Sequence, residues 1–376
     1  MINVKDFFDT LISNKTDFFC GIPDSLLKSF CAYVSDHAGG ANNIITANEG
    51  SAVALASGYH LATSKFPLIY MQNSGLGNAI NPLLSLADEM VYSIPMILLI
   101  GWRGEPNANF KDEPQHAKQG IVTCDLLDAM KIPYAVLNQD YKNQLRQCYE
   151  YLQKNSSPFA LVVQKGTFDN YQLQNSKIQN FNLSREKAIE ICINNIKDKK
   201  AIFISTTGMA SRELFELRKH FKMPHHSDFL TVGSMGHSSQ IALGIALNKP
   251  NRKIICIDGD GAAIMHLGSL ATIGSLKPAN LLHIVINNAA HDSVGSQPTC
   301  ADKIDLCAIA KACGYENCVC VDNENDLNKT LQNLQDNKLT FIEIKTKIGN
   351  RSNLGRPTTT PQENKAAFMQ FLKEQQ

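Results

Sequence analysis

The stretch Lys253-Ile-Ile-Cys-Ile-Asp-Gly-Asp-Gly-Ala-Ala263 joins an apolar run to an acid between two glycines, and Leu282-His-Ile-Val-Ile-Asn-Asn288 joins a second run to two amides. Short continuous apolar runs are typical of strands buried on both faces of a parallel sheet. Ligands of open α/β sheets bind where such strands end. Asp260 offers an anionic oxygen and Asn288 a neutral one, which suit Mg²⁺ on a diphosphate, and glycine lets backbone amides approach an anion. Together the two stretches predict a metal and diphosphate site.

Other interpretations of these stretches are weaker. A dinucleotide-binding loop needs Gly-x-Gly-x-x-Gly, but Ile264 stands where the third glycine belongs. The chain has no Gly-x-x-x-x-Gly-Lys-Ser/Thr loop, which is the common cradle for nucleoside triphosphates. A plain turn and a plain strand end remain the alternative for each stretch taken singly, whereas a strand in front of both favours a site.

The same alternation extends along the whole chain. Helical patterns such as 51–63, 211–220 and 267–275 separate the apolar runs, and strand, helix, strand in repetition indicates an α/β fold with a parallel sheet. The predicted strands are Asn43–Thr46, Pro67–Met71, Met96–Ile100, Ala160–Val163, Ala201–Ile204, Lys253–Ile257, Leu282–Ile286 and Thr340–Ile344.

A polar stretch rich in Gln and Asn, residues 167–182, divides the chain into halves of ordinary domain size. We expect a first domain at residues 1–168, a linker at 169–183 and a second domain at 184–376. Ser184 is a plausible N-cap for the first helix of the second domain. Because the two halves alternate alike, we expect two sheets of one general type.

Charge and hydropathy exclude several classes of protein. The 36 Lys and Arg residues balance 35 Asp and Glu residues, so the chain lacks the basic character of a general nucleic-acid binder. The most apolar run, Ile94–Ile100, is far shorter than the ~20 residues of a membrane-spanning helix. The N-terminus has no signal-peptide core, and the group Cys313, Cys318 and Cys320 matches no zinc spacing. We therefore expect a cytoplasmic protein that contacts neither membrane nor nucleic acid.

The order Gly-Asp-Gly, about 25 residues, then Asn-Asn resembles the motif of thiamine diphosphate-dependent enzymes. The resemblance implies two thiamine diphosphate-binding-fold domains, one for the pyrimidine and one for the diphosphate. It implies that Asp260, Asn288 and the carbonyl of Ala290 bind Mg²⁺, with Asn287 as the alternative to Asn288. Gly259, Gly261 and Ala262 would then contact the cofactor.

The first half offers the glutamate that such an enzyme needs. Glu49 lies between a predicted strand and a helix of small residues in Ile44–Tyr59, which is similar to the family's activating glutamate. A carboxyl group bonded to the pyrimidine ring favours the imino tautomer of the cofactor, whose nitrogen can remove the proton from the thiazolium carbon. Alone, a glutamate in a first helical turn would be only a favourable contact with the helix dipole.

Further segments match the family in register. Gln72–Ala79 resembles the loop beside the pyrimidine, with Asn73 as its cofactor contact. Gly233–His237 is similar to the stretch around the residue between the cofactor rings, which implies roles for Ser234 and Met235. Ser205–Gly208 resembles a diphosphate-binding turn through Thr206 and Thr207. A core methionine and a helix N-cap are the simpler interpretations of the last two segments.

The short linker leaves no room for the middle domain that many 2-oxo acid decarboxylases carry. The absence of a middle domain resembles the phosphonopyruvate decarboxylase family. Five sequence segments also resemble that family: Gly21–Lys28, Gly101–Pro106, Lys111–Gly120, His291–Gly295 and Asn350–Thr359. The resemblance implies decarboxylation of 3-phosphonopyruvate to phosphonoacetaldehyde and CO₂, in phosphonate biosynthesis of the 2-aminoethylphosphonate type. It also implies a homodimer at least, because in this family the glutamate and the metal site come from different subunits.

An anionic substrate needs cations or amide donors. The candidates are Arg356, which we prefer, and Arg351, Lys118, Arg103 and Lys111. Polar residues expected near the reacting atoms are Asp24, Ser25, His116, His291 and Asp292, and His116 could relay a proton. The alternatives are a sulfopyruvate decarboxylase, a carboligase of the same family, and a non-catalytic regulatory subunit with the same fold.

Overall fold

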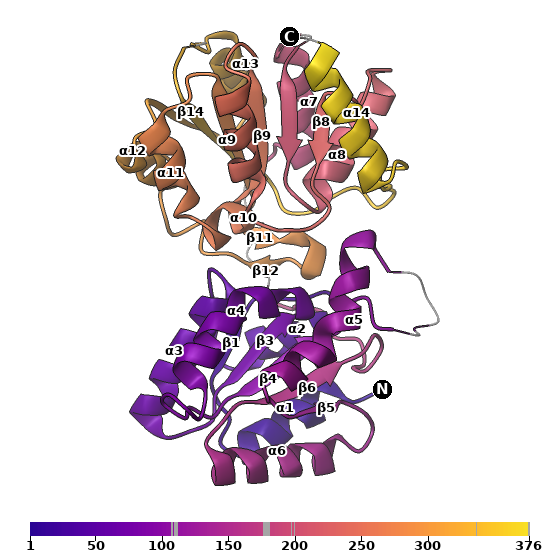
Figure 1. Cartoon of the computed structure of the whole chain (residues 1–376), viewed down its shortest axis with the longest axis vertical. Coiled ribbons are helices and arrows are strands. Elements are labelled where there is room, and N and C mark those ends of the chain that lie inside the picture. Colours follow the sequence, from indigo (N-terminus) through magenta and orange to yellow (C-terminus); the bar gives the residue numbers. More distant parts are fainter. Residues whose placement is uncertain are drawn as a thin grey trace. The chain divides into compact units, whose positions relative to one another are not determined.

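The computed structural model describes residues 1–106, 108, 112–175, 181–196, 198, 200–335 and 337–374. The chain forms two compact units, Met1–Ser176 and Lys177–Gln376. In each unit a six-stranded sheet lies between helices (Figure 1). The predicted α/β class with two similar domains is confirmed.

Unit 1 is a parallel sheet with the strand order β2-β1-β3-β4-β6-β5. Its strands are β1 (Phe19–Gly21), β2 (Asn43–Ile45), β3 (Leu68–Gln72), β4 (Ile97–Gly101), β5 (Tyr134–Val136) and β6 (Phe159–Val163). Its helices are α1 (Val4–Ser13), α2 (Lys28–His37), α3 (Glu49–Thr63), η1 (Asn73–Gly75), α4 (Leu76–Pro82), η2 (Leu83–Ala87), α5 (Pro114–Ala129) and α6 (Tyr141–Asn155). Alternate residues of β4 enter two different cores, Ile97 with α1, α2 and α6, and Leu98 with α3, α4 and α5. Burial on both faces explains the continuous apolar runs.

Unit 2 repeats this plan with the order β13-β14-β10-β9-β7-β8. Its parallel strands are β7 (Ile202–Ser205), β8 (Asp228–Leu230), β9 (Ile254–Gly259), β10 (Leu281–Asn287), β13 (Asn317–Val321) and β14 (Thr340–Lys345), and β11 (Ala290–His291) pairs antiparallel with β12 (Gln297–Pro298). Its helices are α7 (Arg185–Asn195), α8 (Met209–His220), α9 (Ser238–Asn248), α10 (Asp260–Met265), α11 (Ser269–Leu276), η3 (Asp292–Val294), α12 (Leu306–Cys313), α13 (Glu324–Gln332) and α14 (Pro361–Glu374). Counted along each chain segment, both six-stranded sheets have the spatial order 2-1-3-4-6-5.

All eight predicted strands are present, with ends shifted by one or two residues. In the two six-stranded sheets, the sequence did not predict β1, β5, β8 and β13. The first three have three residues each and so are too short to give a periodic pattern, and β13 lies at the edge of its sheet and is mostly half-buried. The prediction of an N-cap is confirmed, because the Oγ of Ser184 accepts a hydrogen bond from the Lys187 amide at 3.2 Å.

Both ends of the predicted linker pack on a unit. The Val4 amide donates to Asp169 Oδ1 at 3.0 Å, and the Tyr171 hydroxyl donates to Asp36 Oδ2 at 3.0 Å, so residues 169–175 lie on unit 1. Leu183 is buried in the core of unit 2. Residues 176–180 of the predicted linker lie outside the described residues.

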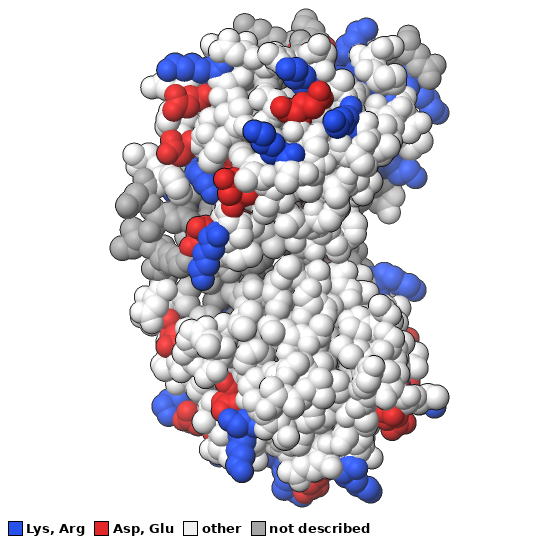
Figure 2. All heavy atoms as spheres, turned by 90° about the vertical axis from the view of Figure 1, so that its left-hand side faces the viewer, with Lys and Arg blue, Asp and Glu red and all other residues white. Residues whose placement is uncertain are grey.

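The surface agrees with the near-neutral composition. On the face drawn in Figure 2, Lys and Arg side chains are mixed with Asp and Glu rather than gathered by sign. In the part of the chain that the structure describes, every helix is too short or too polar to cross a membrane.

A pair of glycines tests the packing of unit 2. A Cβ on Gly274 of α11 would lie 2.0 Å from the Cys313 carbonyl oxygen, whereas a Cβ on the exposed Gly244 of α9 would meet nothing within 4 Å. We expect Gly274→Ala to lower the free energy of unfolding by about 1–3 kcal/mol through overpacking. Gly244→Ala should raise it by about 1 kcal/mol, because alanine is the better helix former. Urea unfolding followed by circular dichroism measures both; equal effects of the two substitutions would contradict the close helix contact.

Candidate active site

In unit 2 the neighbouring parallel strands β9 and β10 end side by side, and Asp260 and Asn288 follow their ends. Both side chains are buried. The Asp260 carboxylate accepts a hydrogen bond from Thr299 Oγ1 at 2.5 Å, and the backbone amides of Gly261 and Asn288 also point to it. Burial nevertheless raises the pKa of Asp260 to about 7, because no cation in the described structure offsets the lost hydration.

The two asparagines are distinguished by their partners. Asn287 donates to Glu343 Oε1 at 2.6 Å and accepts from the Ala289 amide at 2.9 Å, so its side chain holds the turn together. Among the described residues, the Oδ1 of Asn288 accepts one hydrogen bond, from the Ala290 amide at 3.0 Å, and an amide oxygen has two lone pairs. Asn288 is therefore the better candidate for a metal ligand.

Ala290 could add a third oxygen. It lies opposite Pro298 in the β11–β12 pair, and proline has no amide hydrogen to donate to a partner carbonyl. A carboxylate, a carboxamide and a carbonyl form the set of hard oxygen donors that Mg²⁺ prefers. These residues fit the ion that the sequence predicts.

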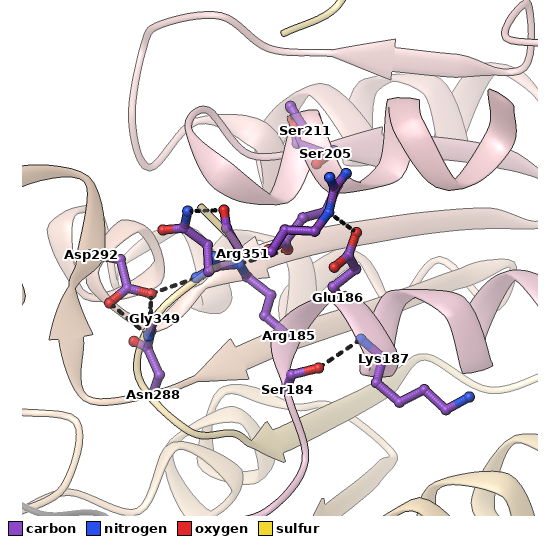
Figure 3. A network of polar contacts seen from close by, with 12 residues as sticks. Ser184, Arg185, Glu186, Lys187, Ser205, Ser211, Asn288, Asp292, Gly349 and Arg351 are labelled. Carbon is purple, nitrogen blue, oxygen red and sulfur yellow. Dashed lines mark hydrogen bonds and ion pairs between the residues drawn. The ribbon is translucent and has the colours of Figure 1, made fainter. Parts of the chain in front are cut away.

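A buried ionic network that includes Asp292 and Arg185 supports the side chain of Asn288 (Figure 3). The amide nitrogen of Asn288 donates to Asp292 Oδ2 at 2.8 Å, and the same oxygen accepts Arg185 Nη1 at 2.8 Å. Arg185 also donates two hydrogen bonds to the Glu213 carboxylate, at 2.8 and 3.0 Å. Gly349 donates its amide to Asp292 at 3.2 Å. Asp292 thus positions Asn288, and its place near the reacting atoms stays a prediction.

No local sequence pattern points to Arg185 or Glu213 as site residues. Arg185 opens a helix, where an arginine is ordinarily solvated, and only its 7% exposure shows the buried ion pair. Thr299, the hydroxyl donor to Asp260, lies 39 residues further along the chain, so no local pattern connects the two residues.

Several predicted cofactor residues meet around Gly261. A Cβ there would lie 2.7 Å from His291 Cε1 and 3.4 Å from Met235 Cε. Burial lowers the pKa of His291 to about 4, so its imidazole is neutral at pH 7. Two more predicted cofactor residues lie near Gly261 in sequence. Ala262 is buried in α10, and a Cβ built on Gly259 would lie 3.9 Å from Thr206 Cγ2.

The hydroxyls of the predicted diphosphate-binding turns are partly engaged. Thr207 Oγ1 donates to the Val232 carbonyl at 2.8 Å, and Ser211 Oγ donates to the Thr206 carbonyl at 2.7 Å. Ser234 is exposed, with a left-handed φ of 55°. Contacts of Thr206, Thr207 and Ser234 with the diphosphate stay predictions.

In unit 1, Glu49 opens α3 behind Asn48, whose side chain caps the helix by accepting the Ser51 amide at 2.8 Å. The Glu49 carboxylate is buried and accepts from Asn78 Nδ2 at 2.8 Å. It lies directly on Gly75, where a Cβ would stand 2.5 Å from Oε1. Because glycine has no Cβ, Gly75 leaves the space in which the Glu49 carboxylate lies.

A second group of predicted residues meets at the ends of β1, β3 and β4. Asp24 is fully buried and accepts from Gln72 Nε2 at 2.6 Å, and burial raises its pKa. Ser25 accepts from Arg103 Nη1 at 2.8 Å. Burial, with the nearby Arg103 charge, lowers the pKa of His116 to about 4. Its Nδ1 has no hydrogen-bond partner among the described residues.

The side chain of Asn73 contacts Arg103 and Thr123. Its Nδ2 donates to the Arg103 carbonyl and to Thr123 Oγ1, both at 2.8 Å, and its Oδ1 accepts the Arg103 amide at 3.2 Å. The carboxamide therefore fixes the backbone after β4, and a direct cofactor contact of Asn73 stays a prediction.

The predicted substrate cations differ in availability. Arg103 is ion-paired with Asp112, and Arg351 with Glu216 and, at 2.8 Å, with Glu186. Lys118 and Arg356 are exposed, on α5 and on the loop before α14. Lys111 lies outside the described residues.

Comparison with known proteins agrees with this geometry. The model of the N-terminal TPP binding domain of thiamine pyrophosphate enzymes matches residues 3–129, and that of the C-terminal TPP binding domain matches residues 206–344. The chain therefore belongs to the thiamine pyrophosphate enzymes, and it has their two cofactor-binding domains with no third domain between them.

The individual relatives narrow the assignment. The chain is 32% identical to phosphonopyruvate decarboxylase of Streptomyces viridochromogenes, over 99% of this chain and 95% of that protein. It is 33% identical to the Streptomyces hygroscopicus enzyme, over 100% and 95%. Sulfopyruvate decarboxylase of Methanosarcina acetivorans is 27% identical, over 95% and 94%. Within the larger family, the chain belongs with the phosphonopyruvate decarboxylases, and it is a thiamine diphosphate-dependent carboxy-lyase.

The raised pKa of Asp260 predicts a pH-dependent stability without cofactor. Its usual value is 3.8 and its folded value about 7, so between these pH values the unfolded chain ionises while the folded chain keeps the proton. Stability is therefore lost as pH rises, by about 4 kcal/mol in total. Asp260→Asn removes this cost, so the variant should gain on the wild type from pH 4 to 7 and no further above. Urea unfolding of both proteins across that range tests this; parallel pH curves would contradict it.

Proposed function

We propose that this protein decarboxylates 3-phosphonopyruvate to phosphonoacetaldehyde and CO₂, with thiamine diphosphate and Mg²⁺. The observation that carries the proposal is similarity over essentially the full length to two phosphonopyruvate decarboxylases, at 32% and 33% identity against 27% for a sulfopyruvate decarboxylase. We further propose a cytoplasmic enzyme of phosphonate biosynthesis of the 2-aminoethylphosphonate type. Loss of CO₂ would draw forward an unfavourable reaction that supplies the substrate.

Asp260, Asn288 and the Ala290 carbonyl would hold Mg²⁺ against the diphosphate. The metal would replace the proton that burial keeps on Asp260, since a cation stabilises the ionised carboxylate. Thr299 would keep one oxygen of Asp260 oriented, and Asp292 would keep the amide of Asn288 oriented. Gly259, Gly261 and Ala262 would let the backbone approach the diphosphate, beside Thr206 and Thr207.

Bound thiamine diphosphate supplies the electron sink for the decarboxylation. Glu49 would hydrogen-bond the aminopyrimidine ring, with Gly75 and Asn78 holding the carboxylate in place. His116 and His291, neutral at pH 7, could each accept or relay a proton. Asp24, whose pKa burial raises, could hold one. We also propose a homodimer or larger homo-oligomer with active sites between subunits, because the family resemblance implies that the glutamate and the metal site come from different subunits.

Recognition of the phosphonate would fall to exposed cations. Arg356, on the exposed loop before α14, is the preferred ligand, and the exposed Lys118 of α5 is the second choice. Proline at position 357 restricts the loop that carries Arg356.

Asp292 tests the proposed support of the metal site. Asp292→Asn keeps the size of the side chain but removes the charge between Arg185 and Asn288, so we expect Mg²⁺ and thiamine diphosphate to bind about 10–100-fold more weakly. Calorimetric titration measures both affinities. Glu186→Gln is the matched control, because it breaks the pair with Arg351 and does not touch Asn288. Equal losses in the two variants would show that the effect is not specific to Asn288.

A coupled aldehyde assay tests the substrate. We expect kcat/KM for phosphonopyruvate to exceed that for sulfopyruvate and pyruvate at least about tenfold, and to require both thiamine diphosphate and Mg²⁺. Glu49→Ala should lower kcat about 10²–10⁴-fold while titration still shows cofactor bound. A preference for sulfopyruvate, or acyloin products from pyruvate, would replace the proposed substrate or reaction. Activity retained in Glu49→Ala would show that another group activates the cofactor.

A further inference from the structure

Three metal-binding side chains lie together in the core of unit 2, apart from the oxygen ligands described above. Cys256 and Asp258 are two residues apart on β9, so they share one face of the sheet. His283 lies opposite Cys256 in the register of β10. Their ligand atoms all lie within 4.8 Å of one another, and all three residues are buried, each with at most 1% exposure.

Two of these atoms are unpartnered. Asp258 Oδ2 and His283 Nε2 are 3.6 Å apart, and neither has a hydrogen-bond partner among the described residues. A buried carboxylate oxygen without a partner is costly, and 3.6 Å is too long for a hydrogen bond. Ligands at ~2.0–2.2 Å from a tetrahedral Zn²⁺ stand about 3.3–3.6 Å apart, which is the separation seen here.

Neighbouring groups orient His283 Nε2 and Asp258 Oδ2 toward each other. The Nδ1 of His283 lies 3.0 Å from the Tyr315 hydroxyl, so Nε2 is the nitrogen that faces Asp258. The other oxygen of Asp258 accepts the Gly259 amide at 3.0 Å. A partner on the second ring nitrogen is the usual support of a metal-bound histidine.

We propose that Cys256, Asp258 and His283 bind a divalent transition metal of the Zn²⁺ class. One thiolate and one carboxylate neutralise the two positive charges, which suits an apolar core. The thiol proton is released to solvent as the metal–sulfur bond forms, and no oxidation or reduction is involved. Thiolate and imidazole ligands favour Zn²⁺ or Co²⁺ over Mg²⁺.

A second cluster in the same unit lacks these features. Asp305, Cys307 and Glu343 also lie within 4.8 Å of one another, but their carboxylates are already engaged. Glu343 is paired with Lys345 at 2.6 Å and accepts from Asn287, and Asp305 caps α12 by accepting the Ala308 amide at 2.8 Å. We therefore do not propose a metal site at this second cluster.

The position of the proposed metal suggests what it does. It would join β9 to β10 just before the ends that carry Asp260 and Asn288. It would therefore stabilise unit 2 and fix the spacing of the two strand ends, without contacting substrate.

Cobalt provides the test. The full chain, without an affinity tag, is treated with chelator and titrated with Co²⁺ in excess Mg²⁺. We expect one Co²⁺ per chain with a thiolate-to-cobalt charge-transfer band, and Zn²⁺ should displace it. Cys256→Ser and His283→Gln should abolish the band or weaken binding at least about tenfold. Cys192→Ser, a buried cysteine of α7 outside the cluster, should keep it.

Two results would contradict the proposed metal site. A wild-type protein that binds no Co²⁺ under these conditions, or a band that survives in Cys256→Ser, would overturn the proposal. If the variants do not fold, X-ray absorption of the zinc-loaded wild type decides: one sulfur among the ligands supports the site, and a shell of nitrogen and oxygen alone overturns it. None of these measurements depends on decarboxylase activity, so the proposal and the proposed function can fail separately.

Discussion

The burial of one carboxylate, Asp260, is the constraint on which the rest of unit 2 depends. A buried acid must be neutralised or surrounded by donors, and the chain supplies Thr299 and two backbone amides at the ends of β9 and β10. These donors do not suffice, because the pKa of Asp260 still rises to about 7. The protein groups thus offset only part of the cost of burying this charge. The buried Arg185–Asp292 pair holds the neighbouring Asn288 amide in place.

The two units show that one topology can carry two different chemistries. Both six-stranded sheets have the same strand order, yet Glu49 follows the second strand of its unit and Asp260 the third. Function therefore resides in the residues at the strand ends and not in the fold. Glycine serves the same purpose in both units, since Gly75 and Gly261 leave room for a functional side chain where any Cβ would collide.

The ion pairs also limit how the protein can recognise an anionic substrate. With Arg103 and Arg351 bound to carboxylates, their role is to hold loops in place. Arg103 joins Asp112 to Ser25, and Arg351 joins the loop before α14 to α7 and α8. A contact of either arginine with the substrate stays a prediction.

The sequence by itself predicted the α/β class, eight of the twelve strands in the two six-stranded sheets, a division within residues 167–182, and Glu49, Asp260 and Asn288 as candidate site residues. Each of these is written in local pattern: continuous apolar runs, or a glycine, acid or amide at a strand end. Only the tertiary structure revealed β1, β5, β8 and β13, the different partners of Asn287 and Asn288, the support by Thr299 and Arg185, and the Cys256–Asp258–His283 cluster. The physical reason is that these depend on contacts between residues far apart in the chain, such as the 107 positions between Arg185 and Asp292. Burial, which turns an ordinary surface arginine into part of a site, exists only once the chain has folded.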